Sequence, residues 1–226
     1  MKYLEYTPLA RINAFLSNVN LGDCLIQGAL EAYSCKLAGM DKKLSRSLEQ
    51  EVLDSLCFLP NLSTSPVGPL SSSASRKTLI YLILTLNHMY PDYDFSMLRA
   101  HHFSKELGPC AAKQKIEQFM LEATKIWEVQ AGEEIPLMDS VWTAIDEVME
   151  LGDCDVYSCV PDFEGDPFAD RGSIWSFNYF FYNKKLKRIL CFSCRCLSTM
   201  GIGESSIEDL SSEGEFEFVQ GMDLEE

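Results

Sequence analysis

The hydrophobic pattern of the main body of this chain changes its period after Leu151-Gly152, and that change constrains the fold more than any other feature. From about residue 76 to that point the apolar residues recur at helical spacing, and beyond it they alternate with the two-residue period of β-strands. A strand that is apolar on both faces is buried on both. Residues 174–182 have this property, with one face formed by Trp175, Phe177, Tyr179 and Phe181 and the other by Phe180 and Tyr182. We therefore expect this segment at the centre of a sheet that helices cover on each side.

Other segments supply the rest of that architecture. Residues 188–197 pair with 174–182 in a predicted hairpin around Asn183-Lys184-Lys185-Leu186, and two further strands are predicted over 154–160 and 24–36. Three long apolar stretches predict helices, at residues 78–90, 116–127 and 138–149. The fold class that follows is α+β, with an antiparallel sheet of four or five strands packed by helices in a single globular domain.

Composition divides the chain into four parts. Residues 1–39 are the N-terminal part of the core, a helix plus a strand, and residues 76–200 are its main part. Residues 40–75 are rich in serine and predict a mobile regulatory connector that contains a short helix around Leu48 to Leu56. Residues 201–226 hold nine of the 34 acids and no Lys or Arg, which predicts a disordered acidic tail.

Charge, hydropathy and cysteine usage narrow the functional classes. The formal net charge is −15, which argues against free DNA or RNA as the main ligand, because neutralising phosphates requires basic surface. The longest apolar run, Leu79–Leu84, is far shorter than the ~18 residues of a membrane span. Nine cysteines without a secretory signal indicate reduced thiols. We therefore expect that the protein binds neither a membrane nor, directly, a nucleic acid.

The sequence contains no recognisable catalytic constellation. Its three histidines, His88, His101 and His102, have no metalloprotease spacing, and the phosphate-binding and nucleophile-elbow motifs are missing. A cluster at Cys191, Cys194 and Cys196 suggests a zinc site, yet in a strand Cys191 points away from the other two. Buried small hydrophobic residues are the favoured interpretation, with no metal, no cofactor and no enzymatic activity. The alternatives are a zinc- or thiol-dependent enzyme built on these cysteines and a direct DNA-binding factor.

Several polar residues have the setting of regulatory or contact sites. Ser45 follows Lys42 and Lys43 as in basophilic kinase sites, and three further phosphorylation candidates are Ser47, Ser65 before Pro66, and Ser212. A basic cluster at the hairpin predicts a nuclear import signal, formed by Lys184, Lys185, Lys187 and Arg188. Acidic side chains on predicted loops are the candidates for partner binding, namely Asp92, Asp94, Asp162, Glu164, Asp166 and Asp170.

Three ordered blocks of the chain resemble the eukaryotic Maf family of RNA polymerase III repressors. The longest is the aromatic run from Trp175 to Arg188, WSFNYFFYNKKLKR. The middle block is RKTL at residues 76–79 followed by PDYDFS at 91–96, and the N-terminal block ends in YSCKLAG at 33–39.

The resemblance implies a non-catalytic repressor. Such a protein binds RNA polymerase III near the clamp of its largest subunit and blocks engagement with TFIIIB through the Brf subunit. It also implies that kinases of the protein kinase A and TOR pathways phosphorylate the connector, which keeps the protein inactive. Phosphorylation-dependent shuttling between the cytoplasm and the nucleus is the localisation that follows.

Overall fold

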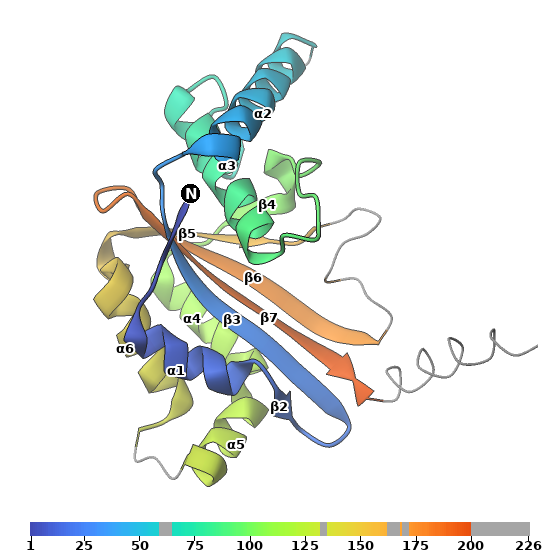
Figure 1. Cartoon of the computed structure of the whole chain (residues 1–226), viewed down its shortest axis with the longest axis vertical. Helices are drawn as coiled ribbons and strands as arrows, with labels where there is room; N and C mark the ends of the chain where they lie inside the picture. The colour runs from blue at the N-terminus through green and yellow to red at the C-terminus, as the bar shows by residue number, and fades with distance from the viewer. Residues whose placement is uncertain (59–64, 132–134, 162–167, 169–171, 200–226) are drawn as a thin grey trace, which may run out of the picture.

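An antiparallel sheet of seven strands runs through the centre of the described part of the molecule (Figure 1). This computed structural model describes residues 1–58, 65–131, 135–161, 168 and 172–199. The strand order is β1-β3-β7-β6-β5-β4, and β2 pairs with β3 beside β1. The strands are β1 (Lys2–Leu4), β2 (Val19–Asn20), β3 (Cys24–Ser34), β4 (Phe103–Lys105), β5 (Cys154–Cys159), β6 (Ser173–Asn183) and β7 (Arg188–Ser198).

Helices cover both faces of the sheet, as Figure 1 shows. One layer contains α1 (Thr7–Leu16), α4 (Pro109–Phe119), α5 (Leu121–Ala131) and α6 (Leu137–Met149). The other contains α2 (Gly39–Phe58) and α3 (Ser73–Met89), and the short 3₁₀ helices are η2 (Ala100–His102) and η3 (Leu151–Asp153). No helix within the described ranges has the length and apolar character of a membrane span.

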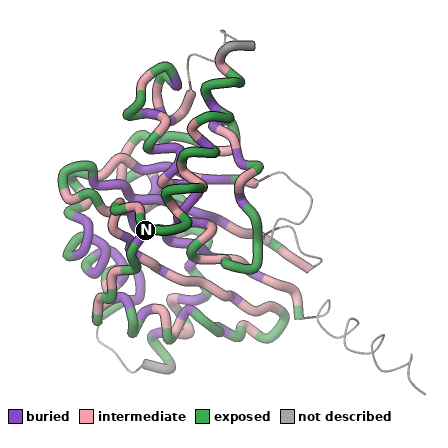
Figure 2. The backbone as a smooth tube through the Cα atoms, turned by 45° about the horizontal axis from the view of Figure 1, so that its top comes forward, coloured by how far each residue is buried: buried purple, intermediate pink, exposed green. Residues whose placement is uncertain are grey.

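The central strand β6 divides its aromatic side chains between two hydrophobic cores, as the sequence predicts. Phe177, Tyr179 and Phe181 are buried in the core that α1, α4, α5 and α6 form with the sheet. Phe180 and Tyr182 are buried in the opposite core, beneath α2 and α3. Figure 2 shows how continuous the buried backbone is along the middle strands. The predicted α+β class is confirmed.

The sheet has more strands than the four or five expected, because β1, β2 and β4 are only two or three residues long. Strands this short have no detectable alternation in the sequence. The helix predicted over 116–127 is two helices that meet at Met120, whose backbone N–H donates to the carbonyls of both Ile116 and Glu117. This tightening of the last turn ends α4 while Met120 itself stays fully buried.

The segment predicted as a connector contains a longer helix than expected. A short helix was expected near Leu48, whereas α2 spans twenty residues, Gly39–Phe58. Leu48 and Val52, one turn apart, are buried against the α3 side of the sheet. The other faces of α2 are polar, which hides its periodicity in the sequence. The mobility of residues 40–75 stays a prediction, and the predicted acidic tail lies outside the described residues.

Candidate partner-binding site

An exposed loop with acidic and aromatic side chains, residues 91–97, connects α3 to η2. Asp92 and Asp94 are exposed on either side of Tyr93, whose side chain is 38% exposed. Met97, at 63% exposure, adds an apolar side chain to the same surface. The Asp94 Oδ1 atom accepts a hydrogen bond from the Ser96 backbone N–H at 2.9 Å, a contact that holds the turn.

Buried aromatic side chains hold this loop from beneath. Phe95 is fully buried, and its ring centroid lies 6.1 Å from that of Tyr90. Phe168 packs edge-on against Tyr90 at 5.2 Å. The Phe95 backbone N–H donates to Asn87 Oδ1 at 3.1 Å, which ties the loop to the last turns of α3. The loop therefore lies at the surface, but these buried contacts hold its backbone in place.

A buried chain of polar groups fixes Tyr90 to the sheet. The Tyr90 hydroxyl and Ser193 Oγ are 2.6 Å apart, and Ser193 Oγ donates to Asn178 Oδ1 at 2.7 Å. Asn178 and Ser193 are only 2% and 1% exposed. Because the single proton of Ser193 Oγ is donated to Asn178, the Tyr90 hydroxyl is the donor to Ser193, and burial raises the pKa of Tyr90. Each of these three side chains has a hydrogen-bond partner among the others, and this arrangement sets the position of the loop above β6 and β7.

Arg99 closes the far end of the loop. Its guanidinium donates to the carbonyls of Ser96 at 2.7 Å and Leu98 at 3.0 Å. The same group forms an ion pair with Glu51 of α2 at 3.0 Å. The Arg99 side chain thus contacts both the loop and α2. A displacement of α2 would therefore alter the contacts that Arg99 makes with the loop.

The structure brings together only some of the predicted contact residues. Asp92 and Asp94 lie on one loop, as expected. Their neighbours Tyr93 and Met97 were not predicted, although an aromatic residue between two acids after Pro91 was the available signal. The four remaining candidates lie outside the described residues, namely Asp162, Glu164, Asp166 and Asp170, as does the phosphorylation candidate Ser212. Their assignment stays a prediction.

The phosphorylation candidates Ser45 and Ser47 lie in helical backbone. Ser45 is partly buried and Ser47 is exposed, both in α2. The sequence predicts a mobile connector around Ser45, whereas the structure has helical backbone at this position; the assignment of Ser45 as a phosphorylation site stays a prediction. A kinase binds an extended substrate, so phosphorylation at this position would require α2 to open locally. Lys42 and Lys43 are exposed beside it, as the kinase motif requires.

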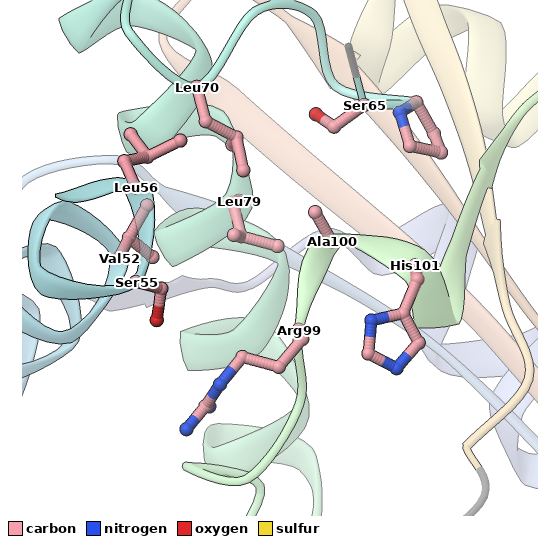
Figure 3. Close-up of a pocket in the computed structure, with 10 residues that line it drawn as sticks. Val52, Ser55, Leu56, Ser65, Leu70, Leu79, Arg99, Ala100 and His101 are labelled. Atoms are coloured by element: carbon pink, nitrogen blue, oxygen red, sulfur yellow. The ribbon is translucent and has the colours of Figure 1, made fainter. Parts of the chain in front are cut away.

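The candidate Ser65 lines an apolar pocket of about 260 Å³ between α2, α3 and η2 (Figure 3). Val52 and Leu56 of α2 and Leu79 of α3 form part of the wall. Ser65 Oγ donates to the Gly68 carbonyl at 2.6 Å within a tight turn. That turn must also open before a kinase binds Ser65.

The predicted import cluster lies at the turn between β6 and β7, where most of its cations are engaged. Lys184 forms an ion pair with Asp155 at 2.7 Å and Lys185 with Asp153 at 2.9 Å. Burial opposes ionisation of Asp155, but hydrogen bonds from lysines outweigh it and lower its pKa. Arg188 donates to the Val148 carbonyl at 3.0 Å.

The cysteine cluster is divided between the two cores. Cys191 is buried on the α3 side of the sheet and Cys194 and Cys196 on the other, as the strand alternation predicted. Burial raises the pKa of all three thiols, that of Cys196 to about 12. Thiolates are the nucleophiles and metal ligands, so protonated thiols suit packing. Among the described residues no three His, Cys, Asp or Glu side chains are grouped to hold a metal ion.

The sheet thus supports an exposed acidic and aromatic loop, and the thiols of Cys191, Cys194 and Cys196 are buried in its two cores. Comparison with known proteins gives the family. The Maf1 regulator family model matches residues 26–193. The chain is 33% identical to the "Repressor of RNA polymerase III transcription" of Dictyostelium discoideum, covering 89% of this chain and 87% of that protein. It is 36% identical to the Schizosaccharomyces pombe protein "Repressor of RNA polymerase III transcription maf1", covering 85% and 82%.

Solved structures agree with the sequence comparison. A crystal structure of citrus MAF1 superposes with a TM-score of 0.68 at 51% identity, covering 85% of this chain and 98% of that one. A second crystal form gives a TM-score of 0.70 at 50% identity, covering 85% and 100%. The chain belongs to the Maf1 regulator family, and the resemblance of the three sequence blocks is confirmed.

Proposed function

We propose that this chain represses transcription by RNA polymerase III, acting without catalysis by binding the polymerase near the clamp of its largest subunit. The bound repressor blocks engagement with TFIIIB through the Brf subunit. The names of the relatives support the polymerase as target. The observation that carries the mechanism is the rigidly anchored 91–97 loop with Asp92, Tyr93, Asp94 and Met97 exposed. Surfaces that hold nucleic acid are basic, so carboxylates on a fixed loop favour encounter with their rims.

An order-of-addition transcription assay tests this proposal. Purified polymerase III, TFIIIB and a tRNA gene are combined, and the protein is added before or after the preinitiation complex has formed. Addition before assembly is expected to inhibit transcription, and addition afterwards is expected to have little effect, because the blocked surface is then occupied. Equal inhibition in the two orders, or none in either, contradicts the proposed block.

Phosphorylation of Ser45 is the proposed off-switch, made by kinases of the protein kinase A and TOR pathways. A phosphate adds about −1.5 to −2 charges beside Lys42 and Lys43. Because Ser45 is partly buried in α2, a phosphate there also disfavours the packing of this helix on α3. The ion pair between Glu51 and Arg99 connects α2 to the 91–97 loop, so the loss of that packing weakens the contact surface.

Co-purification with RNA polymerase III tests the switch. Ser45→Ala is expected to bind at least as well as the unmodified chain, and Ser45→Asp is expected to bind less. Ser55→Asp is the matched control, because Ser55 is exposed on the same helix and is not a phosphorylation candidate. Equal recovery of the two Ser45 variants removes this residue from the switch.

We further propose that the protein moves between cytoplasm and nucleus under this phosphorylation. The import signal is the basic cluster at the β6–β7 turn, and its ion pairs with Asp153 and Asp155 imply that a receptor must replace them. A variant with glutamine at Lys184, Lys185 and Lys187 is expected to stay in the cytoplasm when dephosphorylated. Imaging of a fluorescent fusion measures this, with Lys77→Gln as the control. Unchanged nuclear accumulation refutes the assignment.

A further inference from the structure

One end of the sheet carries a group of lysines that form no ion pair with any described residue. They are Lys2, Lys36, Lys42, Lys43 and Lys187, all exposed, and they are called the basic end here. This is unusual for a chain whose first 200 residues hold 19 cations against 25 acids. Such a concentration of like charge creates a local positive potential that attracts acidic groups.

Backbone contacts place these lysines next to one another. The Cys35 backbone N–H donates to the Lys187 carbonyl at 2.9 Å, so Lys36 and Lys187 are adjacent. Lys2 of β1 is paired with Ser34 of β3, one residue before Cys35. Lys2, Lys36 and Lys187 therefore lie on neighbouring segments of the backbone at the same end of the sheet.

The start of α2 adds the other two. Asp41 Oδ1 contacts His88 Nε2 at 3.1 Å, and the His88 ring lies 5.5 Å from that of Tyr33. Tyr33 belongs to the β3 segment that ends at the basic end, so Lys42 and Lys43, which follow Asp41, approach the same place. In Figure 1 the β6–β7 turn, the chain start and the rise into α2 lie together. Asp41 contacts the Met1 amino group, and Asp153 and Asp155 contact Lys184, Lys185 and Lys105, so these three carboxylates are paired with cations other than the five lysines.

We propose that the acidic segment 201–226 of this chain binds the basic end. Charge complementarity identifies the occupant, because the segment has nine acids and no Lys or Arg. The segment is also long enough to reach the basic end. β7 has eleven residues and separates the basic end from the start of the segment by about 35 Å. The 27 residues after Thr199 extend up to about 90 Å. Attachment to the same chain gives an effective concentration on the order of millimolar, so a weak contact is occupied.

Three properties follow from this assignment, and none depends on the repressor proposal. The contact weakens as salt rises, because exposed charges are screened. It covers the cations beside Ser45 and beside the predicted import cluster. It is also selective, because the acidic remainder of the surface repels the segment.

Zero-length carbodiimide coupling of the full chain tests the proposal, since it joins a carboxylate to a lysine amine that touches it. Mass spectrometry then identifies the coupled pairs. At low salt the acids of 201–226 are expected to couple at least several-fold more often to the five lysines than to Lys77, an exposed lysine on α3 without an ion pair to any described residue. Raising the salt to about 0.5 M reduces the coupling. A variant with Lys36→Gln, Lys42→Gln and Lys187→Gln reduces it at low salt, and Lys77→Gln does not.

Each other result overturns the proposal. Coupling spread evenly over basic-end and control lysines means that the segment has no preferred site. A lack of coupling from 201–226 means that the basic end has a foreign occupant or none. Where coupling to the basic end is observed, mixing unlabelled with ¹⁵N-labelled chains shows whether it lies within one chain, and coupled pairs that join one label to the other assign the contact to a second copy and overturn the proposal.

Discussion

Ser193 bridges two buried polar groups, and its replacement by alanine tests how the 91–97 loop is anchored. Ser193→Ala removes the hydrogen bonds to the Tyr90 hydroxyl and to Asn178 Oδ1, which are 2.6 and 2.7 Å long. A buried polar group without a partner costs about 1–3 kcal/mol. Asn178 keeps no room for water at 2% exposure, so we expect a loss of roughly 2–3 kcal/mol in the free energy of unfolding. For a chain of this length that lowers the melting temperature by about 4–10 °C.

A double-mutant cycle with Tyr90→Phe isolates the bridge. Tyr90→Phe alone is expected to cost about 1 kcal/mol, because Ser193 keeps its bond to Asn178. The double variant should be close to Ser193→Ala, with a coupling of about 1 kcal/mol, since the tyrosine hydroxyl has already lost its acceptor. Urea unfolding measures all three, with Ser104→Ala, on an exposed part of β4, as the control. A loss below about 0.5 kcal/mol for Ser193→Ala, or strictly additive effects, refutes this anchoring.

Three further perturbations follow from the packing. Gly28→Ala places a Cβ atom 3.0 Å from Cys194 Sγ, and urea unfolding should report a loss of about 1–3 kcal/mol, whereas no loss contradicts the close approach of β3 and β7. Leu48→Ala removes a buried contact of α2, so hydrogen exchange should become faster in α2 while the sheet is unaffected; exchange that speeds up everywhere, or nowhere, argues against a separately attached helix. Burial raises the pKa of Cys35 and Cys154 from 9.0 to about 12, so the unfolded chain loses these protons first and stability should fall as the pH rises through that window; a flat profile in urea unfolding contradicts it.

The strongest sequence patterns predicted the fold where packing decides local structure. The two faces of β6 and its hairpin with β7 were predictable because large aromatic residues alternate without interruption. The length of α2 was not, because only every fourth residue, such as Leu48 and Val52, is buried. A sparse apolar stripe in a polar segment is typical both of a surface helix and of a loop.

The exposed acidic residues of the candidate site were predictable from the sequence, whereas the buried residues that hold the loop in place were not. Asp92 and Asp94 after Pro91 indicate an exposed turn. The residues that hold that turn in place are Ser193 and Asn178, on strands about a hundred residues further along the chain. Their contact with Tyr90 depends on strand register and on the position of α3 over the sheet, and neither is encoded locally.

The binding affinity for purified RNA polymerase III tests the central claim, which is that the 91–97 loop is the contact surface of a non-catalytic scaffold. The informative variant combines Asp92→Asn, Tyr93→Ala and Asp94→Asn, because asparagine at position 94 keeps the turn-holding acceptor while removing the charge. Its melting temperature is expected to fall modestly, because Tyr93→Ala removes the ring contacts with Tyr90 and Phe95, and the variant should remain folded in the assay. Its affinity should fall by about tenfold or more, roughly 1.4 kcal/mol. An unchanged affinity in a folded variant would contradict the claim.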